Sequence, residues 1–306
     1  MPLFWYLRAM EEKTKPAPPR WAKIFNIIGK VFIALWVLAI IYVGYLLSPF
    51  VGAMYSITKI PNTYFEIKVD KENHRAIYKQ VTTMPGDWVP LDKISKRLRG
   101  AIISSEDGKF YTHPGYDIEE LQDAINDGVV KKKKKVRGAS TITQQLIKNL
   151  YFQSDRSVWR KVKEMALTLW IEDHVEKDRI LETYLNVIEY GENLYGIKDA
   201  AKFYFNKEPA KLTARESAFL AMLLPSPKRY AQSFRKKQLT SFANRIIQSV
   251  LFKMLQGGYI GIEEYYDNLD SRFTWEKHAQ PEPNEPIVID PNQLEPEASS
   301  DDLGNL

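Results

Sequence analysis

The sequence contains no cysteine, and that absence excludes a disulfide framework and any thiolate metal site. Histidine is scarce as well. Its four copies show no paired spacing, so a histidine-based metal cluster is not expected. No internal repeat is visible, and strand-like alternation is rare after residue 91. What the chain has instead is 44% hydrophobic residues over a length of 306, enough for one large domain or two small ones.

One stretch without charge dominates the N-terminal region. Residues 31–48 contain no charged side chain, and residues 24–29 extend the apolar character across Lys30. About 20 apolar residues cross a hydrocarbon core as a helix, so residues 31–48 are predicted to be a transmembrane helix. Basic residues outnumber acidic ones in residues 1–30, which the positive-inside rule assigns as a cytoplasmic tail. A cleaved signal peptide is the alternative, although the long preceding tail and the missing small-residue cleavage site disfavour it.

The other end of the chain lacks positive charge. Residues 279–306 contain five prolines, seven acidic residues and neither Lys nor Arg, so this acidic, Pro-rich tail is predicted to be disordered. The net charge of +5 therefore resides elsewhere, and it is compatible with anionic lipid or phosphate as well as with nucleic acid. Five consecutive lysines at 131–135 are interpreted as a solvated, mobile loop or as a segment close to anionic headgroups.

A short β-hairpin is predicted just after the apolar stretch. Residues 64–69 alternate in part between apolar and polar side chains, and residues 75–78 follow a polar turn. The surrounding residues 49–90 are assigned as a juxtamembrane linker that carries this hairpin.

From residue 91 onward the periodicity is helical. Apolar residues within 180–188 recur on one helix face, and residues 239–255 predict another helix that is stopped by two glycines. Thr213 and Glu216 have the spacing of a capping box ahead of an apolar run. Residues 91–278 are therefore predicted to form a mainly α-helical domain.

Three polar signatures lie in the first half of that domain. The first contains two carboxylates and a histidine: Glu106, Asp107 and His113. The second contains hydroxyl, amide and amine groups: Ser140, Thr141, Thr143, Gln144, Gln145, Lys148 and Asn149. The third contains a carboxylate among cations: Arg160, Lys161, Lys163 and Glu164. Carboxylates, fixed cations and hydrogen-bond donors together suit a reaction that activates a sugar hydroxyl and expels a phosphorylated leaving group.

Each signature also has a plainer interpretation. Glu-Asp-Gly alone is typical of an exposed acidic turn. The second signature is typical of a polar helix N-terminus with Ser140 or Thr141 as its cap. Arg160 and Glu164 have the spacing of a surface salt bridge on a helix. His113 is interpreted as a structural residue that fixes the loop after the first carboxylates.

In order and spacing, the signatures resemble glycosyltransferase family 51, the peptidoglycan glycosyltransferases that polymerise lipid II. The resemblance runs from about residue 91 to residue 230 and continues through Ile180-Leu181-Glu182-Thr183-Tyr184-Leu185-Asn186, Tyr195-Gly196-Ile197, Glu216-Ser217-Ala218 and Pro225-Ser226-Pro227. It implies a mainly α, lysozyme-like helical domain with a small membrane-proximal jaw subdomain, preceded by one transmembrane helix.

The resemblance also implies roles for individual residues. Glu106 aligns with the catalytic base, and the negative charge of Asp107 is expected to help raise the pKa of Glu106. Glu164 aligns with a second essential glutamate that stabilises or orients the donor, in one alternative through a divalent cation, Mg or Mn. No resident metal site and no other cofactor are expected. The residues assigned to substrate are Asp107, Ser140, Thr141, Thr143, Gln144, Gln145, Lys148, Asn149, Arg156, Arg160 and Lys161.

The function implied is that of a monofunctional enzyme, without a transpeptidase module, anchored in the cytoplasmic membrane with its catalytic domain outside. It would build β-1,4 glycan strands for the cell wall by inverting transfer from an undecaprenyl-pyrophosphate-linked donor. Its expected partners are lipid II, the nascent glycan strand, the membrane and cell-wall synthesis proteins, not nucleic acid. A glycan-cleaving hydrolase and an inactive lipid II-binding scaffold remain as alternatives.

The chain departs from the family pattern at four places. Gly108-Lys109 replaces an Arg-rich pair, Asp123 stands where Arg is common, and Ala139 replaces a second glycine. The lysine run at 131–135 lies between the first two signatures. These departures are expected to change the affinity for the donor and the behaviour of the segment between the first two signatures as a lid. They are not expected to change the class of reaction.

Overall fold

The structure, a computed structural model, describes residues 19–70, 72, 75–118, 122, 140–153 and 159–276, without the side chains of residues 22 and 23. The chain divides into two compact units, Met1–Gly52 and Ala53–Leu306. Several features singled out in the sequence lie outside the described residues. They are Asp123, the lysines at 131–135, Ala139, Arg156 and the acidic tail.

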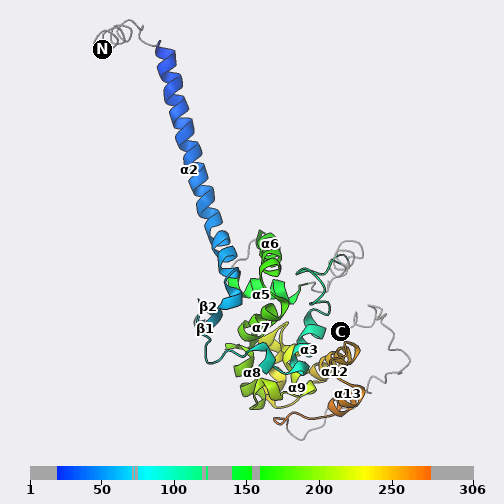
Figure 1. Cartoon of the computed structure of the whole chain (residues 1–306). Helices are drawn as coiled ribbons and strands as arrows, with labels where there is room; N and C mark the ends of the chain where they lie inside the picture. The colour runs from blue at the N-terminus through cyan, green and yellow to red at the C-terminus, as the bar shows by residue number, and fades with distance from the viewer. Residues whose placement is uncertain are drawn as a thin grey trace. The chain divides into compact units, whose positions relative to one another are not determined.

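The first unit contains most of one long helix, α2 (Arg20–Ile57), drawn in blue in Figure 1. Within the described residues, Ile24–Ile57 is the one helical stretch long and apolar enough to cross a membrane. From Ile24 to Leu47 its large apolar side chains are exposed, as a helix that faces lipid requires. These features fit a membrane-anchored protein, and the helix extends beyond both ends of the charge-free stretch at 31–48.

Helix α2 continues through Pro49, where a proline would ordinarily break it. Proline has no backbone N–H, so the carbonyl of Tyr45, four residues earlier, loses its helical partner. The hydroxyl of Ser48 donates to that carbonyl oxygen at 2.8 Å. This replacement hydrogen bond matters most in an apolar surrounding, where no water can satisfy the carbonyl.

The second unit begins with the predicted hairpin, after a 3₁₀ turn η1 (Ile60–Asn62). Strands β1 (Tyr64–Asp70) and β2 (Arg75–Val81) pair in antiparallel fashion, which confirms the hairpin and lengthens its second strand. The Tyr78 hydroxyl donates to the carbonyl of Val187 at 3.0 Å, so the hairpin is fixed to the helical part of the unit.

The rest of the second unit is mainly α-helical, as the sequence predicts. Its helices are α3 (Lys96–Glu106), α5 (Ile142–Tyr151), α6 (Trp159–His174), α7 (Lys177–Val187), α8 (Ile197–Phe205), α9 (Ala214–Leu223), α10 (Pro227–Tyr230), α11 (Gln232–Lys236), α12 (Ser241–Gln256) and α13 (Ile262–Leu269). The described part of the unit also contains two short antiparallel strands, β3 (Glu189–Gly191) and β4 (Leu194–Tyr195), and the 3₁₀ turns η2 (Leu91–Lys93) and η4 (Pro209–Lys211). The helices predicted at 180–188 and 239–255 correspond to α7 and α12.

Helix α9 is the centre of the core. Every one of its residues is buried, so the helix is enclosed on all sides. It packs against α3, α12 and α13, which lie around it in Figure 1. Thr213 and Glu216 form the predicted capping box at its start, and Lys207 pairs with the Glu216 carboxylate at 2.9 Å. The capping box therefore fixes where the central helix begins.

Close packing also fixes helix α3, whose last residue is Glu106. A Cβ atom on Gly100 would lie 2.4 Å from the ring of Tyr259, so only glycine lets this ring touch the helix. At the start of α3 the Ser95 side chain accepts a hydrogen bond from the backbone N–H of Arg97. The position of Glu106 is thus set by contacts along the whole helix.

Candidate active site

Glu106, the last residue of α3, is partly exposed and is held by an amide. Its Oε2 atom accepts a hydrogen bond from Gln145 Nε2 at 2.7 Å. Burial is the largest effect on its pKa and raises it, and the charge of Asp107 adds a smaller rise, as predicted. The hydrogen bond from Gln145 and the charge of Lys253 act in the opposite direction. The net effect is a pKa above the ordinary value, which suits a group that accepts a proton near neutral pH.

A buried tyrosine holds the amide of Gln145. The Tyr184 hydroxyl donates to Gln145 Oε1 at 2.9 Å, and the Tyr184 side chain is fully buried. Because the amide oxygen is engaged by the hydroxyl, the amide nitrogen faces Glu106. The three residues come from α3, α5 and α7, so three helices meet at this carboxylate. The role of Tyr184 was not predicted from the sequence.

Asp107 lies inside the protein and links the first two signatures. Its Oδ1 atom lies 2.7 Å from His113 Nε2, and its Oδ2 atom accepts the backbone N–H of Ile142 at 3.0 Å. The backbone N–H of Gly115 donates to His113 Nδ1 at 3.0 Å, which places the ring proton on Nε2. His113 therefore fixes the loop after Glu106, in agreement with the structural role predicted for it. Asp107 was assigned to substrate binding, yet both its oxygens have partners inside the protein.

The start of α5 is fixed by Thr141, one of the two predicted caps. Its hydroxyl accepts from the backbone N–H of Gln144 at 3.2 Å and donates to the carbonyl of Gly115 at 2.7 Å. Gly115 has φ +95°, and a Cβ atom there would lie 2.7 Å from Thr168 Cγ2 and 2.8 Å from Glu172 Cγ. The loop of the first signature is therefore in close contact with both α5 and α6.

The second candidate carboxylate, Glu164 on α6, is surrounded by cations. It is 2% exposed and forms the predicted ion pair with Arg160. Lys161 Nζ lies 3.7 Å from Glu164 Oε2 and donates to Gln144 Oε1 at 3.2 Å. It also lies 3.5 Å from Ser140 Oγ. Lys161 therefore connects the second and third signatures.

A further ion pair, between Glu172 and Lys177, lies beside the candidate site and was not predicted from the sequence. Lys177 pairs with Glu172 at 2.7 Å and donates to the carbonyl of His113 at 2.8 Å. Glu172 in turn accepts the hydroxyl of Thr143, which is fully buried. Glu172 and Lys177 follow no spacing rule relative to Thr143, so no local signal could have revealed them.

The predicted substrate residues thus fall into two groups. Asp107, Thr141, Thr143 and Gln144 are buried and bonded within the protein. The more exposed group reaches the surface of α5 and α6: Ser140, Gln145, Lys148, Asn149, Arg160 and Lys161. Lys148 is exposed and makes no ion pair within the part of the chain that the structure describes. The structure does not describe Arg156.

A resident metal ion does not fit this arrangement. Among the described residues, no group of three or more His, Asp and Glu side chains could hold one. Glu164 is the one carboxylate of the third signature, and its contacts are with Arg160 and Lys161. Hard cations such as Mg²⁺ prefer several oxygen ligands. A divalent cation at the donor pyrophosphate stays a prediction.

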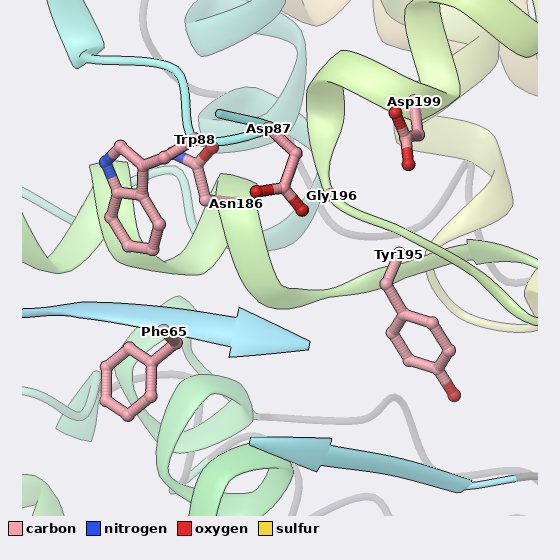
Figure 2. A pocket seen from close by; sticks show the side chains of 7 residues that line it. All are labelled: Phe65, Asp87, Trp88, Asn186, Tyr195, Gly196 and Asp199. Carbon is pink, nitrogen blue, oxygen red and sulfur yellow. The ribbon is translucent and has the colours of Figure 1, made fainter. Parts of the chain in front are cut away.

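Two pockets in the described part of the chain are lined by other residues than Glu106 and Glu164. The first is shown in Figure 2 and is lined by Phe65, Asp87, Trp88, Asn186, Tyr195, Gly196 and Asp199. The second is lined by residues 111–114 of the first signature, by Leu169 and by residues 172–177. Only the second borders the candidate site, along the Glu172–Lys177 pair.

Residues 72–251, more than half of the chain, match the model of the Transglycosylase family, and the chain belongs to that family. The resemblance predicted from the signatures is therefore confirmed, and with it a lysozyme-like helical domain.

Several curated relatives carry the name biosynthetic peptidoglycan transglycosylase. The one from Aeromonas hydrophila subsp. hydrophila is 44% identical over 151 residues, which are 49% of this chain and 63% of the relative. The one from Thiobacillus denitrificans is 45% identical over 143 residues, 47% of this chain and 61% of the relative. The one from Chromobacterium violaceum is 42% identical over 161 residues, 53% of this chain and 70% of the relative. The chain thus spans less than two thirds of the length of the first two relatives.

Proposed function

We propose that this protein is a membrane-anchored peptidoglycan glycosyltransferase that polymerises lipid II, with Glu106 as the general base. The observation that carries the proposal is the environment of Glu106. A partly exposed carboxylate accepts a hydrogen bond from Gln145, and burial raises its pKa. The names of the relatives, biosynthetic peptidoglycan transglycosylases, support the substrate class.

The proposed step begins at the 4-hydroxyl of the GlcNAc of lipid II. Glu106 takes the hydroxyl proton while the oxygen attacks C1 of the MurNAc that ends the growing chain. The bond between C1 and the pyrophosphate oxygen breaks with inversion. The electron pair leaves with undecaprenyl pyrophosphate, and the proton stays on Glu106 until it is released to solvent. The product is a glycan strand longer by one disaccharide, joined by a β-1,4 bond.

The leaving group carries the negative charge that develops in this step, and the cations of α5 and α6 would stabilise it. Arg160 and Lys161 are held by Glu164, and Lys148 is exposed on α5. Arg156 completes the predicted set. Planar guanidinium groups suit a pyrophosphate, and charges held in place before the reaction often contribute most of the rate enhancement in catalysis. A divalent cation bound to the same pyrophosphate would add to this charge.

The membrane anchor gives the proposal its location. Helix α2 would hold the catalytic domain at the outer face of the cytoplasmic membrane, with the basic N-terminal tail inside. A lipid-linked donor is held in that same bilayer. The nascent glycan strand and other cell-wall synthesis proteins would be met on the same side.

The test is polymerisation of lipid II by the full chain in detergent. Wild type should release undecaprenyl pyrophosphate and make lipid-linked polymer, whereas Glu106→Gln should make almost none. Glu263→Gln, at an exposed residue of α13, is the matched control and should behave as wild type. An inactive wild type, or an active Glu106→Gln, refutes the proposal. Cleavage of a preformed glycan strand without polymerisation identifies a hydrolase instead.

A further inference from the structure

We propose that Tyr184 is a positioning residue for the general base, because it holds the Gln145 amide in the one orientation that donates a hydrogen bond to Glu106. This inference rests on the proposed function of Glu106. It adds a residue from α7, outside the three polar signatures, to the machinery of the reaction.

The geometry is a chain of two hydrogen bonds across three helices. Tyr184 Oη donates to Gln145 Oε1 at 2.9 Å, and Gln145 Nε2 donates to Glu106 Oε2 at 2.7 Å. Within the described residues, Gln145 Nε2 makes one other hydrogen bond, a longer one of 3.4 Å to the carbonyl of Ser140. Tyr184 itself is fully buried, so its hydroxyl has no access to water and depends on the amide oxygen as its acceptor.

An amide has two chemically different ends of nearly the same shape, so something must decide which end faces the carboxylate. If the Gln145 amide turned over, its oxygen would face the carboxylate oxygen of Glu106 and repel it. The hydroxyl hydrogen of Tyr184 would at the same time lose its acceptor in a buried position. Leaving such a group unsatisfied is unfavourable, so the hydroxyl selects the productive orientation.

Among the described residues, the charged and titratable groups near Glu106 are Asp107, which directly follows α3, Lys253 from α12 and Tyr184 from α7. Burial holds the pKa of Tyr184 well above its ordinary value, so this residue stays a neutral donor over the pH range of an assay. The hydrogen bond from Gln145 lowers the pKa of Glu106 against the effect of burial. Loss of that hydrogen bond therefore leaves Glu106 with a still higher pKa, and the base is more protonated at a given pH.

The experiment compares pH–rate profiles of the full chain, with kcat and KM for lipid II measured separately. Tyr184→Phe removes only the hydroxyl. It should lower kcat about tenfold at neutral pH, the size expected for a hydrogen bond to a charged group, and leave KM within about twofold. The acid limb of the profile should move to higher pH, so the deficit should shrink as pH rises.

A matched control and a second variant keep the result interpretable. Tyr204→Phe removes the hydroxyl of another buried tyrosine, which donates to the backbone carbonyl of Tyr190 at 2.9 Å and not to the Gln145 amide. It should leave the pH profile unchanged. Gln145→Leu should move the acid limb in the same direction as Tyr184→Phe, and it replaces Tyr184→Phe in the test if that variant does not fold. The double variant should be no worse than Gln145→Leu alone, because both changes act on one interaction.

The possible outcomes separate this inference from the proposed function. If wild type polymerises, Glu106→Gln does not, and Tyr184→Phe has the wild-type profile, the inference is wrong and the proposed function stands. A loss that is equal at every pH, a change confined to KM, or the same effect in Tyr204→Phe also overturns it. If wild type itself is inactive, both fail together.

Discussion

The two glutamates of the site are the same side chain in opposite surroundings. Glu106 ends α3, is partly exposed, and its direct partner is a neutral amide. Glu164 lies within α6, is 2% exposed, and its partners are Arg160 and Lys161. A carboxylate with a neutral partner and a raised pKa can take up a proton. A carboxylate between two cations is suited to hold them in place. The different partners of the two glutamates therefore suit Glu106 to accept a proton and Glu164 to hold cations in place, although the residue type is the same.

The largest effect is expected at Glu106. Glu106→Gln should lower polymerisation by about 10²- to 10⁴-fold, the range typical of a lost general base.

The same substitution, Glu106→Gln, should also stabilise the protein. The folded-state pKa of Glu106 lies above its ordinary value of 4.5. The contribution of this group to the free energy of unfolding is therefore fully present below pH 4.5, and it is lost as pH rises through the folded-state pKa. The melting temperature of Glu106→Gln should therefore exceed that of wild type at pH 7.5, and the gap should close toward pH 4.5. A variant less stable than wild type at pH 7.5 would contradict this account.

Glu164→Gln should differ from Glu106→Gln in the sign of its effect on stability. Loss of the carboxylate leaves Arg160 and Lys161 without their counterion. Both cations are partly exposed, so the free energy of unfolding should fall by only about 1 kcal/mol. Polymerisation should fall about 100-fold, because the cations would no longer be oriented toward the leaving group. Denaturant unfolding together with the lipid II assay checks both numbers, and a rise in stability would remove the contrast with Glu106.

Asp107→Asn tests whether the residue beside the base acts through structure. An Asn side chain has one oxygen, so it cannot accept from both His113 and the Ile142 backbone N–H as Asp107 does. The free energy of unfolding should fall by about 1–3 kcal/mol. Polymerisation should fall with it, and lipid II affinity should change little. A large loss of lipid II affinity with unchanged stability would instead support the direct substrate contact predicted from the sequence.

The smallest effect is expected for Tyr190→Phe. This variant measures how far the removal of a buried hydroxyl changes stability when no hydrogen bond is lost. Within the described residues the Tyr190 hydroxyl is buried and has no hydrogen-bond partner. Its removal should leave activity unchanged and alter the free energy of unfolding by at most about 1 kcal/mol, in the stabilising direction. Thermal unfolding checks the sign. A destabilised variant would show that the hydroxyl has a partner after all.

The sequence predicted those parts of the site that depend on local spacing. Arg160 and Glu164 lie one helical turn apart, so their pairing followed from helix geometry. Thr141 as a cap, the hairpin and the capping box at Thr213 are likewise local. Each of them involves residues close together in the chain.

The parts that the sequence did not predict depend on contacts between distant segments. Gln145 is 39 residues from Glu106, and Tyr184 is a further 39 residues from Gln145. No periodicity connects them, because tertiary packing of α3, α5 and α7 decides which side chains meet. Helix α2 extends beyond both ends of the charge-free stretch at 31–48. At the C-terminal end it continues past Pro49, where the Ser48 hydroxyl replaces the hydrogen bond that the proline removes.

Gly115 has a consequence for how this site can change in evolution. Its φ of +95° suits glycine alone, and the nearest atoms to a Cβ there belong to Thr168, one helical turn after Glu164. A random mutation at Gly115 must therefore disturb the loop of the first glutamate and the helix of the second at once. At this contact, the loop after Glu106 and the helix that carries Glu164 cannot change independently of each other. Lineages that descend from this protein should inherit them as a single unit.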